Sequence, residues 1–291
     1  MNEMCKDVPA VDGDGVNAAS FPADKVSRQS GGGQKPAVYG SYRPLRKITP
    51  LDLQQMYEIF CHYYHNTSLD LFLRDLSKKQ GLFLIRRRSD QRIVGFSTLA
   101  VLTLRDGRRT VRGVFSGDTI IEREYWGSRA LQTQFFLRML WLRVRYPFTP
   151  LFWLLISKGY KTYLLLANNF FRFYPNPAGD DPRHQSLVEQ YCEHMFPGSY
   201  DPQRRLLDFG DDYQRLRENV ADITDDMRER FPRIAFFETR NPSWRQGTEL
   251  PCLGQLGYSD LLRYLFRFVA KQWRASEGRS VATPAAGRGA R

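Results

Sequence analysis

The stretch Val111–Arg145 constrains the fold of this chain more than any other. An apolar-rich run ends at Ile121, a short polar turn Glu122–Gly127 follows, and a long amphipathic segment begins near Trp126. This order predicts a strand that leads through a turn into a helix over 126–145. The first N–H groups of a helix lack intrahelical acceptors and lie at the positive end of the helix dipole. The junction is therefore expected to hold a phosphate.

The positive charge of the chain is concentrated in its middle. The 291 residues carry a formal net charge of +12, from 43 Lys and Arg against 31 Asp and Glu. Residues 41–177 hold 22 basic and 9 acidic side chains, whereas residues 178–291 hold 17 of each. This distribution favours an anionic partner. An acyl carrier protein, the phosphates of a coenzyme, nucleic acid and an anionic membrane surface each fit it.

Both ends of the chain have the composition of disordered tails. Residues 1–40 are rich in Gly, Ser, Asp and Ala without an apolar period, and residues 276–291 are similar. The N-terminus lacks the pattern of a signal peptide, and the uncharged run Tyr146–Ser157 is too short to span a bilayer. Four scattered cysteines without a CxxC spacing predict reduced thiols. We expect a cytoplasmic protein, with association at a membrane surface left open.

The segment 41–177 is interpreted as one α/β domain, in which apolar patterns alternate with turn residues and Asp106-Gly107 predicts a hairpin. The predicted strands are Arg43–Ile48, Gly81–Ile85, Arg92–Leu104, Arg109–Ile121, Leu151–Ile156 and Arg172–Tyr174. The predicted helices begin at Pro50, at Leu69, near Trp126 and at Gly159, and the last three end at Lys79, Arg145 and Phe170.

A C-terminal extension over 178–275 is predicted to be rich in helix. The predicted helices are Gln185–Met195, Asp211–Arg230 and Ser259–Arg274, and Arg233–Thr239 is predicted to be a strand. Phe236–Asn241 is a candidate to complete the sheet of the preceding domain. The last helix carries basic residues beside an apolar face, which suits either packing on its own domain or contact with an anionic bilayer.

The element order and the junction resemble the GNAT superfamily of N-acyltransferases over roughly residues 41–177. The resemblance implies an α/β fold with a mixed, largely antiparallel sheet flanked by helices. In that family the fourth strand aligns the pantetheine arm of an acyl thioester, and the turn into the third helix binds its pyrophosphate. Those positions fall here on Val114–Glu122 and Tyr125–Leu131. The implied cofactor-binding residues are Val114, Ser116, Ile120, Tyr125, Gly127, Ser128, Arg129 and Ala130.

The turn departs from the pattern of the family. Tyr125 and Gly127 match it, whereas Trp126 occupies the position of an arginine, and Arg129 and Leu131 occupy positions of glycines. Bulky side chains there close part of a pyrophosphate cradle, although Arg129 adds charge for a phosphate. Two donors therefore remain open: acyl-CoA, and an acyl carrier protein, which presents a single phosphopantetheine phosphate. A strand, turn and helix that only pack together form the simpler alternative.

Acyl transfer to an amine requires a proton acceptor, and a proton donor for the departing thiolate. Asp118 and Glu122 are the candidate bases because they lie near the predicted strand end, although carboxylates there often form turns or ion pairs. The resemblance implies a tyrosine as the acid, and Tyr163 is preferred to Tyr160 and Tyr174. Packing with a satisfied hydroxyl is the alternative for each tyrosine.

No metal site is expected, because His184, Cys192 and His194 match no zinc spacing. The sequence thus predicts an N-acyltransferase that moves an acyl group from acyl-CoA or an acyl carrier protein to an amine of a small molecule. The alternative is a non-catalytic protein of the same fold that binds an acidic partner or an anionic membrane surface. Nucleic acid is not expected as a partner, because the basic residues form no long run.

Overall fold

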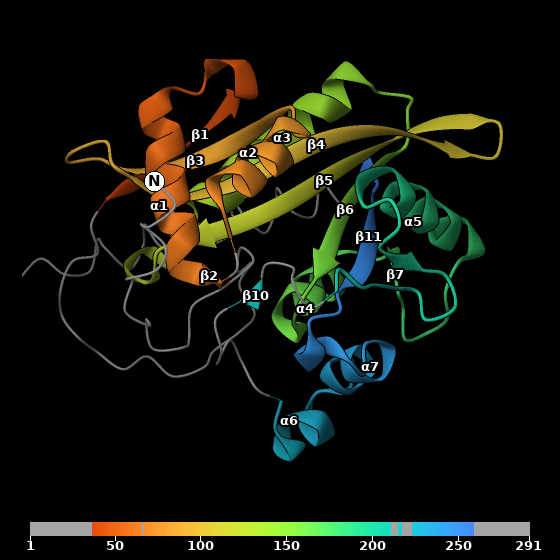
Figure 1. Ribbon diagram of the computed structural model, residues 1–291. Coiled ribbons are helices and arrows are strands. Elements are labelled where there is room, and N and C mark those ends of the chain that lie inside the picture. Colours follow the sequence, from red (N-terminus) through yellow and green to blue (C-terminus); the bar gives the residue numbers. More distant parts are fainter. Residues whose placement is uncertain (1–36, 66, 211–214, 217–222, 259–291) are drawn as a thin grey trace, which may run out of the picture. The chain divides into compact units, whose positions relative to one another are not determined.

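The computed structural model describes residues 37–65, 67–210, 215–216 and 223–258 (Figure 1). The chain divides into two compact units, Leu256–Arg291 and Met1–Gln255, and the latter holds almost all of the described residues. The predicted tail over 276–291, most of the predicted tail over 1–40 and the predicted helix Ser259–Arg274 lie outside the described residues. In the described part, no helix is long and apolar enough to cross a membrane.

A seven-stranded sheet forms the centre of this unit, in the order β1-β3-β4-β5-β6-β11-β7 (Figure 1). The pairs β1–β3, β3–β4, β4–β5 and β11–β7 are antiparallel, whereas β5 and β6 are parallel. This arrangement confirms the expected fold class, a mixed and largely antiparallel sheet flanked by helices. The strands are β1 Val38–Pro44, β3 Gly81–Arg87, β4 Ile93–Asp106, β5 Arg109–Ile121, β6 Leu151–Ser157, β11 Leu250–Leu256 and β7 Phe173–Tyr174.

Seven α-helices and several short elements complete the described part of the chain. The helices are α1 Pro50–Tyr63, α2 Leu69–Ser77, α3 Ala130–Arg145, α4 Tyr160–Asn169, α5 Pro182–Met195, α6 Asp225–Arg230 and α7 Pro232–Arg240. The short strands are β2 Tyr64–His65, β8 Tyr200–Asp201, β9 Leu206–Leu207 and β10 Arg215–Leu216. Three 3₁₀ turns are η1 Leu45–Lys47, η2 Arg123–Tyr125 and η3 Trp244–Gln246.

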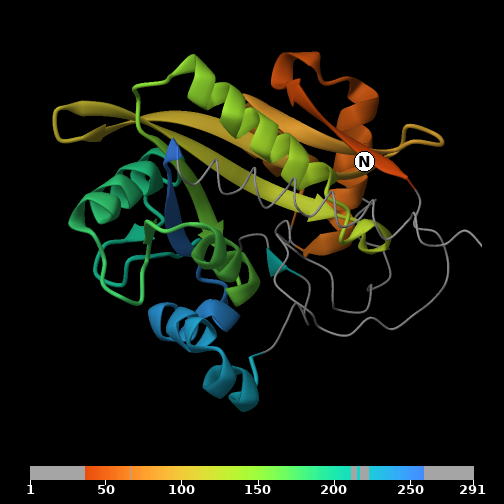
Figure 2. The same cartoon turned by 180° about the vertical axis from the view of Figure 1, so that it is seen from behind.

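Helices cover both faces of the sheet. Helices α1 and α2 pack on one face, where Phe60 and Phe72 meet Phe96 of β4 in one apolar cluster. Alternate residues farther along β4, including Leu102, pack against α5 on the same face (Figure 1). Helix α3 covers the opposite face over β1 and β3 (Figure 2). On this face Phe135 contacts Phe83 at 6.2 Å between ring centroids.

The first strand begins earlier than the sequence predicted. The prediction Arg43–Ile48 is wrong, because β1 spans Val38–Pro44 and a 3₁₀ turn follows it. The register with β3 runs from Val38 opposite Arg87 to Pro44 opposite Gly81, where β3 itself begins. The end of its partner strand therefore limits β1.

The strand predicted over Arg233–Thr239 is also wrong, because these residues form helix α7. Pro232 occupies the first turn of α7, and Ile234 and Phe237 are buried at helical spacing. Phe237 lies against Tyr163 at 6.0 Å between ring centroids. Only the end of the helix predicted over Asp211–Arg230 appears in the described residues, as α6.

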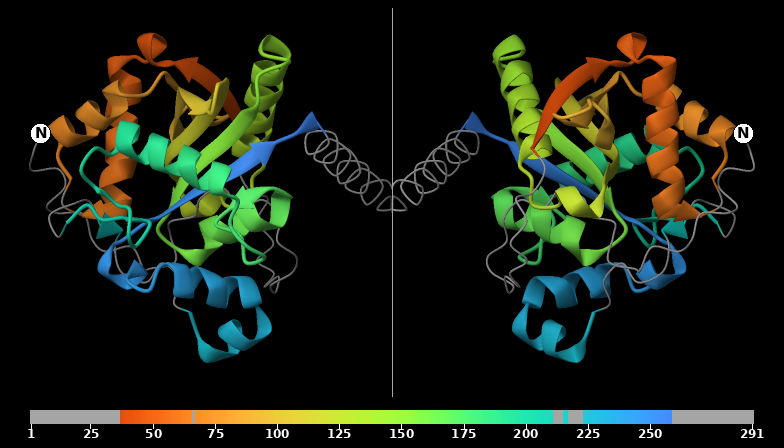
Figure 3. Two further views of the ribbon diagram at one scale, coloured as in Figure 1. Left: turned by 90° about the vertical axis from the view of Figure 1, so that its right-hand side faces the viewer. Right: turned by 90° about the vertical axis from the view of Figure 1, so that its left-hand side faces the viewer.

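A distant segment supplies the strand that lies between β6 and β7. This strand is β11, Leu250–Leu256, the blue strand in Figure 3. It pairs with β7 through Leu253 opposite Tyr174. The sheet therefore contains a strand from the region expected to form a C-terminal extension.

Two of the cysteines agree with the expectation of reduced thiols, since Cys192 and Cys252 are buried and free. Cys61 is disulfide-bonded and departs from that expectation.

Candidate functional site

The strands β5 and β6 part from each other at their carboxyl ends. They pair through only four positions, Arg112–Phe115 with Leu151–Leu154. The register of β4 with β5 then shifts, because Ser97 faces Thr119 while Leu99 faces Ser116, which places one extra residue on β5. Such a bulge bends its strand. The arrows of β5 and β6 diverge beyond it (Figure 1), and we call this region the fork.

A glycine in the bulge permits close approach to the neighbouring strand. A Cβ atom on Gly117 would lie 2.4 Å from the hydroxyl oxygen of Thr98. That hydroxyl is buried and has no hydrogen-bond partner in the described structure. Beyond the bulge, residues 116–121 of β5 pair with β4 along one edge and form no strand pair with β6 among the described residues. This edge of β5 can therefore offer backbone groups to an extended ligand.

Four side chains from separate segments lie near one another beside the fork, and we call them the Glu249 cluster. Asp118 comes from the β5 bulge, Lys158 follows β6, Glu249 precedes β11, and Tyr64 follows α1. The ammonium of Lys158 lies 3.1 Å from Oε1 of Glu249 and 5.2 Å from the centroid of the Tyr64 ring. Asp118 interacts electrostatically with both Tyr64 and Glu249.

Glu249 is a buried carboxylate with spare hydrogen-bonding capacity. Its side chain is 1% exposed, and its Oε2 has no hydrogen-bond partner in the described structure. Burial raises the pKa of Glu249, and Lys158 offsets part of that rise. The backbone is held at both ends, since its N–H donates to the carbonyl of Leu207 and its own carbonyl accepts from the Leu207 N–H, each at 2.9 Å. Glu249 is thus a buried carboxylate with an elevated pKa, and one of its oxygens has no hydrogen-bond partner among the described residues.

The two carboxylates predicted from the sequence lie in different surroundings. Asp118 is partly exposed and belongs to the Glu249 cluster. Glu122 instead accepts a hydrogen bond from Arg92 at 2.5 Å, and its backbone N–H donates to Val94. Glu122 therefore ties the end of β5 to β4.

Two side-chain hydrogen bonds hold the turn after β5. Tyr125 is buried, and its hydroxyl accepts a hydrogen bond from Arg87 at 3.2 Å. The indole N–H of Trp126 donates to the carbonyl of Ile121 at 2.7 Å. Gly127 follows with a φ of +79°, a conformation that favours glycine. Local structure thus accounts for both residues of the Tyr-x-Gly pattern: the buried Tyr125 forms a hydrogen bond through its hydroxyl, and Gly127 adopts the left-handed backbone conformation.

Helix α3 begins at Ala130 and not at Trp126 as predicted. The 3₁₀ turn η2 and the left-handed Gly127 intervene, because a helix cannot continue through a positive φ. The hydroxyl of Ser128 accepts from the N–H of Ala130 at 3.2 Å and so occupies one of the first donors of the helix. Arg129, at the N-cap, is partly exposed and has no side-chain cap bond. The expected phosphate-binding turn therefore offers the charged side chain of Arg129, but one backbone N–H at the start of α3 is already bonded to Ser128.

The three strand residues predicted to contact a cofactor offer little side-chain surface. Val114 and Ile120 are buried, and Ile120 packs with the cluster beneath α1. Ser116 accepts a hydrogen bond from the indole N–H of Trp153 at 2.8 Å. Trp153 itself packs between Phe135 and Phe170, each with ring centroids 5.4 Å away. A ligand along β5 would therefore meet backbone groups and the edge of an indole ring.

The three candidate tyrosines also separate. Tyr163 is fully buried, donates to the carbonyl of Pro175 at 3.1 Å, and has its pKa raised by burial. Tyr174 is buried and accepts from Arg240 at 3.2 Å. Tyr160 occupies the first position of α4, directly after the strand that forms one arm of the fork, and is partly exposed. Burial raises the pKa of Tyr160 as well.

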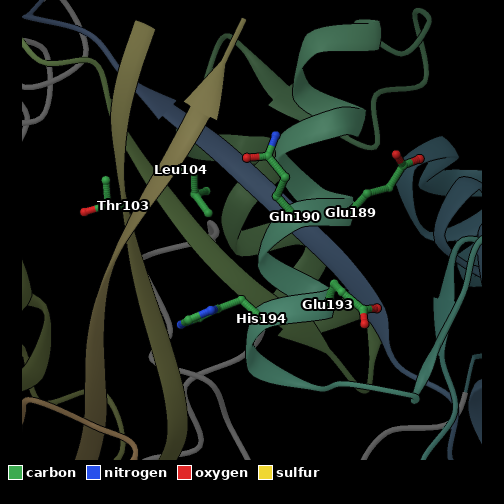
Figure 4. Close-up of a pocket in the computed structure, with 6 residues that line it drawn as sticks. All are labelled: Thr103, Leu104, Glu189, Gln190, Glu193 and His194. Carbon is green, nitrogen blue, oxygen red and sulfur yellow. The ribbon is translucent and has the colours of Figure 1, made fainter. Parts of the chain in front are cut away.

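A surface hollow along α5 lies at the other end of β4. Its lining residues are Thr103, Leu104, Glu189, Gln190, Glu193 and His194 (Figure 4). The two glutamates point away from His194 (Figure 4). Among the described residues no three His, Cys, Asp or Glu side chains are placed to hold a metal ion. The hollow shares no lining residue with the fork or the Glu249 cluster.

The sequence predicts Asp118 as a candidate base, and it gives no indication of Glu249, Lys158, Tyr64 or Trp153. Asp118 was visible because it lies near the end of a strongly patterned strand. Glu249 and Lys158 carry no local signal, since each is a single charged residue next to an apolar run. Only the placement of β11 next to β6 brings them together.

No protein-family model matches the chain, and no curated protein matches its sequence. Among solved structures, a conserved protein of Enterococcus faecalis described as a probable N-acyltransferase is 14% identical, with a TM-score of 0.33. That match covers 45% of this chain and 32% of the other, so the chain spans about a third of the Enterococcus protein.

Two Escherichia coli structures are also similar. The GNAT family N-acetyltransferase YhbS, solved in complex with CoA, is 11% identical over 47% of this chain and 74% of its own, with a TM-score of 0.33. ElaA is 11% identical over 48% of this chain and 93% of its own, with a TM-score of 0.31. Each is a structure that the present chain resembles over about half of its length.

Proposed function

We propose that the protein is an acyltransferase that moves an acyl group from a thioester donor to an amine. One observation carries the proposal: β5 and β6 part beside a buried carboxylate, and the end of β5 leads to the start of a helix. An unpaired strand edge suits an extended pantetheine arm, and a helix start suits a phosphate. A carboxylate with a raised pKa suits the proton transfer that aminolysis needs.

The donor is proposed to lie along β5. Its amide-containing arm would bond to the backbone of Ser116–Ile121, beside the buried side chains of Val114 and Ile120. Its phosphate would meet the turn formed by Tyr125, Gly127, Ser128, Arg129 and Ala130. Because Ser128 already occupies one helix amide, the turn suits one phosphate with an arginine partner. Acyl-CoA and acyl-phosphopantetheine on a carrier protein are both proposed donors.

The reaction forms a C–N bond and breaks the C–S bond of the thioester. The amine attacks the carbonyl carbon, and a backbone N–H of β5 beyond the bulge stabilises the developing oxyanion. Glu249 accepts the proton that the amine loses, and Asp118 assists by its charge. Tyr160 gives a proton to the departing thiolate. Glu122 and Tyr163 are the second candidates for the base and the acid. The carboxylate of Glu122 already accepts a hydrogen bond from Arg92, and the hydroxyl of Tyr163 already donates one to the carbonyl of Pro175.

The acceptor is proposed to be an amine of a small molecule. The test uses full-length protein titrated calorimetrically with acyl-CoAs and acyl carrier proteins, followed by detection of the released thiol with a panel of amines. The proposal expects saturable binding of at least one donor class and amine-dependent thiol release. Absence of binding by both classes would overturn it and leave the alternative, a non-catalytic protein for an acidic partner or an anionic membrane surface.

A further inference from the structure

Helix α3 carries apolar side chains on both of its long faces. Its inner face is buried through Leu131, Phe136, Met139 and Leu142. A second apolar set points outward with spacings of three, four and seven residues, and its members are Leu137, Leu140, Trp141 and Val144. Their exposed fractions range from 40% to 73%. A contiguous exposed apolar face on a helix indicates a surface that contacts a partner or a membrane.

The turn after α3 extends this surface with one more exposed ring. Phe148 is 97% exposed. A hydrogen bond holds the turn that contains Phe148, because the buried side chain of Arg143 donates to the carbonyl of Thr149 at 2.8 Å. The outer face of α3, as we call it, consists of Leu137, Leu140, Trp141, Val144 and Phe148.

Arginine side chains border the outer face and are held on aromatic rings. The guanidinium of Arg138 lies 4.4 Å from the ring centroid of Trp141 and 4.2 Å from that of Tyr42. Arg145 is exposed and lies 5.1 Å from the ring of Tyr146. Arginines held in this way keep their charge near the surface while their stems cover apolar area.

Acidic residues are absent from the sequence around this face. Between Glu124 and Asp180 the chain contains no Asp or Glu. The basic residues in that interval are Arg129, Arg138, Arg143, Arg145, Lys158, Lys161 and Arg172. The face therefore combines Trp, Phe and Leu with the positive charge of Arg138 and Arg145, in a stretch of sequence without acidic residues.

We propose that the outer face of α3 binds the surface of an anionic lipid bilayer. Apolar rings flanked by arginines are the composition of helices that lie in the headgroup region, where the rings enter the acyl boundary and the arginines meet lipid phosphates. A second copy of this chain fits less well, because a two-fold contact brings the same arginines opposite each other. The inference is independent of the proposed acyl transfer, since it uses no residue of the fork.

The test is co-sedimentation of the full-length protein with vesicles. One set contains phosphatidylcholine alone, and the other contains about one third phosphatidylglycerol. We expect binding to the anionic set that weakens as salt is added. Exchanging Trp141→Ser together with Phe148→Ser should lower the partition constant about tenfold or more. Exchanging Arg138→Gln together with Arg145→Gln should lower it about fivefold per arginine.

Matched exchanges outside the face provide the controls. Phe231→Ser removes another exposed ring, and Arg108→Gln with Arg109→Gln removes two charges from the β4–β5 hairpin. Both controls should bind vesicles as the wild type does, and thermal melts should show that all variants fold. No binding by the wild type, or equal binding by the face variants, would overturn the proposal. Self-association that Trp141→Ser with Phe148→Ser abolishes, without vesicle binding, would overturn it in favour of an interface between copies.

Discussion

At the scale of single residues, burial gives Glu249 its chemistry. A carboxylate that is 1% exposed beside one ammonium is not fully compensated, so its pKa rises above the ordinary value of 4.5. Lys158 keeps the group oriented through Oε1, which leaves Oε2 for a proton. A general base works best when its pKa approaches the working pH, and this environment moves Glu249 in that direction.

Exchanging Glu249→Gln should lower kcat/KM for amine acylation about a hundredfold or more, because the amide keeps the shape and loses the proton acceptor. The value of kcat/KM for each variant is obtained from the rate of thiol release under identical conditions. Glu193→Gln, on the exposed side of α5, is the matched control and should leave the rate unchanged. Activity that survives Glu249→Gln would transfer the role of base to Asp118.

Asp52 illustrates a purely structural carboxylate at the same scale. It accepts a hydrogen bond from Arg86 at 2.5 Å and forms a capping box with Thr49 at the start of α1. Burial raises the pKa of Asp52, but the bonds from Arg86 and Thr49 outweigh burial, so that the pKa lies below its ordinary value of 3.8. A lowered pKa contributes stability that is present above pH 3.8 and lost as the pH falls through the lowered value.

Exchanging Asp52→Asn should therefore reduce the free energy of unfolding by about 2 kcal/mol at neutral pH. The difference from the wild type should shrink as the pH falls below 3.8. Urea unfolding at a series of pH values measures both effects. Asp75→Asn, whose partner Lys78 is half exposed, should change stability far less. A pH-independent difference for Asp52→Asn would contradict this account.

At the scale of elements, the sequence predicted what local patterns determine. The strand β5 was predicted with both of its ends, because alternating apolar residues run from the Asp106-Gly107 turn to a polar turn. The start of α3 was misplaced because Trp126 looks apolar and helical, whereas its indole bonds back to Ile121. The aromatic residues of α7 favour a strand in the sequence, whereas their packing on Tyr163 stabilises a helix.

The turn between β5 and α3 yields a prediction about donor binding. Exchanging Gly127→Ala places a Cβ at a φ of +79° and should cost about 1 kcal/mol of stability. The turn should shift, and affinity for a thioester donor should fall about tenfold if its amides hold the phosphate. Gly198→Ala is the matched control, with a φ of +77° in an open loop, and should cost similar stability without changing affinity.

At the scale of the whole molecule, contacts between distant segments build the candidate site. Asp118 and Lys158 lie near each other because β5 pairs with β6, and Glu249 joins them because β11 lies next to β6. The sequence predicted the sheet and Asp118, but the position of β11 depends on tertiary pairing, for which Leu250–Leu256 carries no distinguishing pattern. Burial of Glu249 depends on that same pairing, so its elevated pKa was equally invisible in the sequence.

The central claim is that a thioester donor lies along β5 beyond the bulge and ends at the start of α3. Amide hydrogen exchange of the full-length protein, with and without octanoyl-CoA or octanoyl-phosphopantetheine, tests it most directly. The account predicts that ligand slows exchange in residues 116–121 and 127–131, and that Gly127→Ala weakens the effect at the turn. Unchanged exchange in both segments with either ligand at saturating concentration would contradict it.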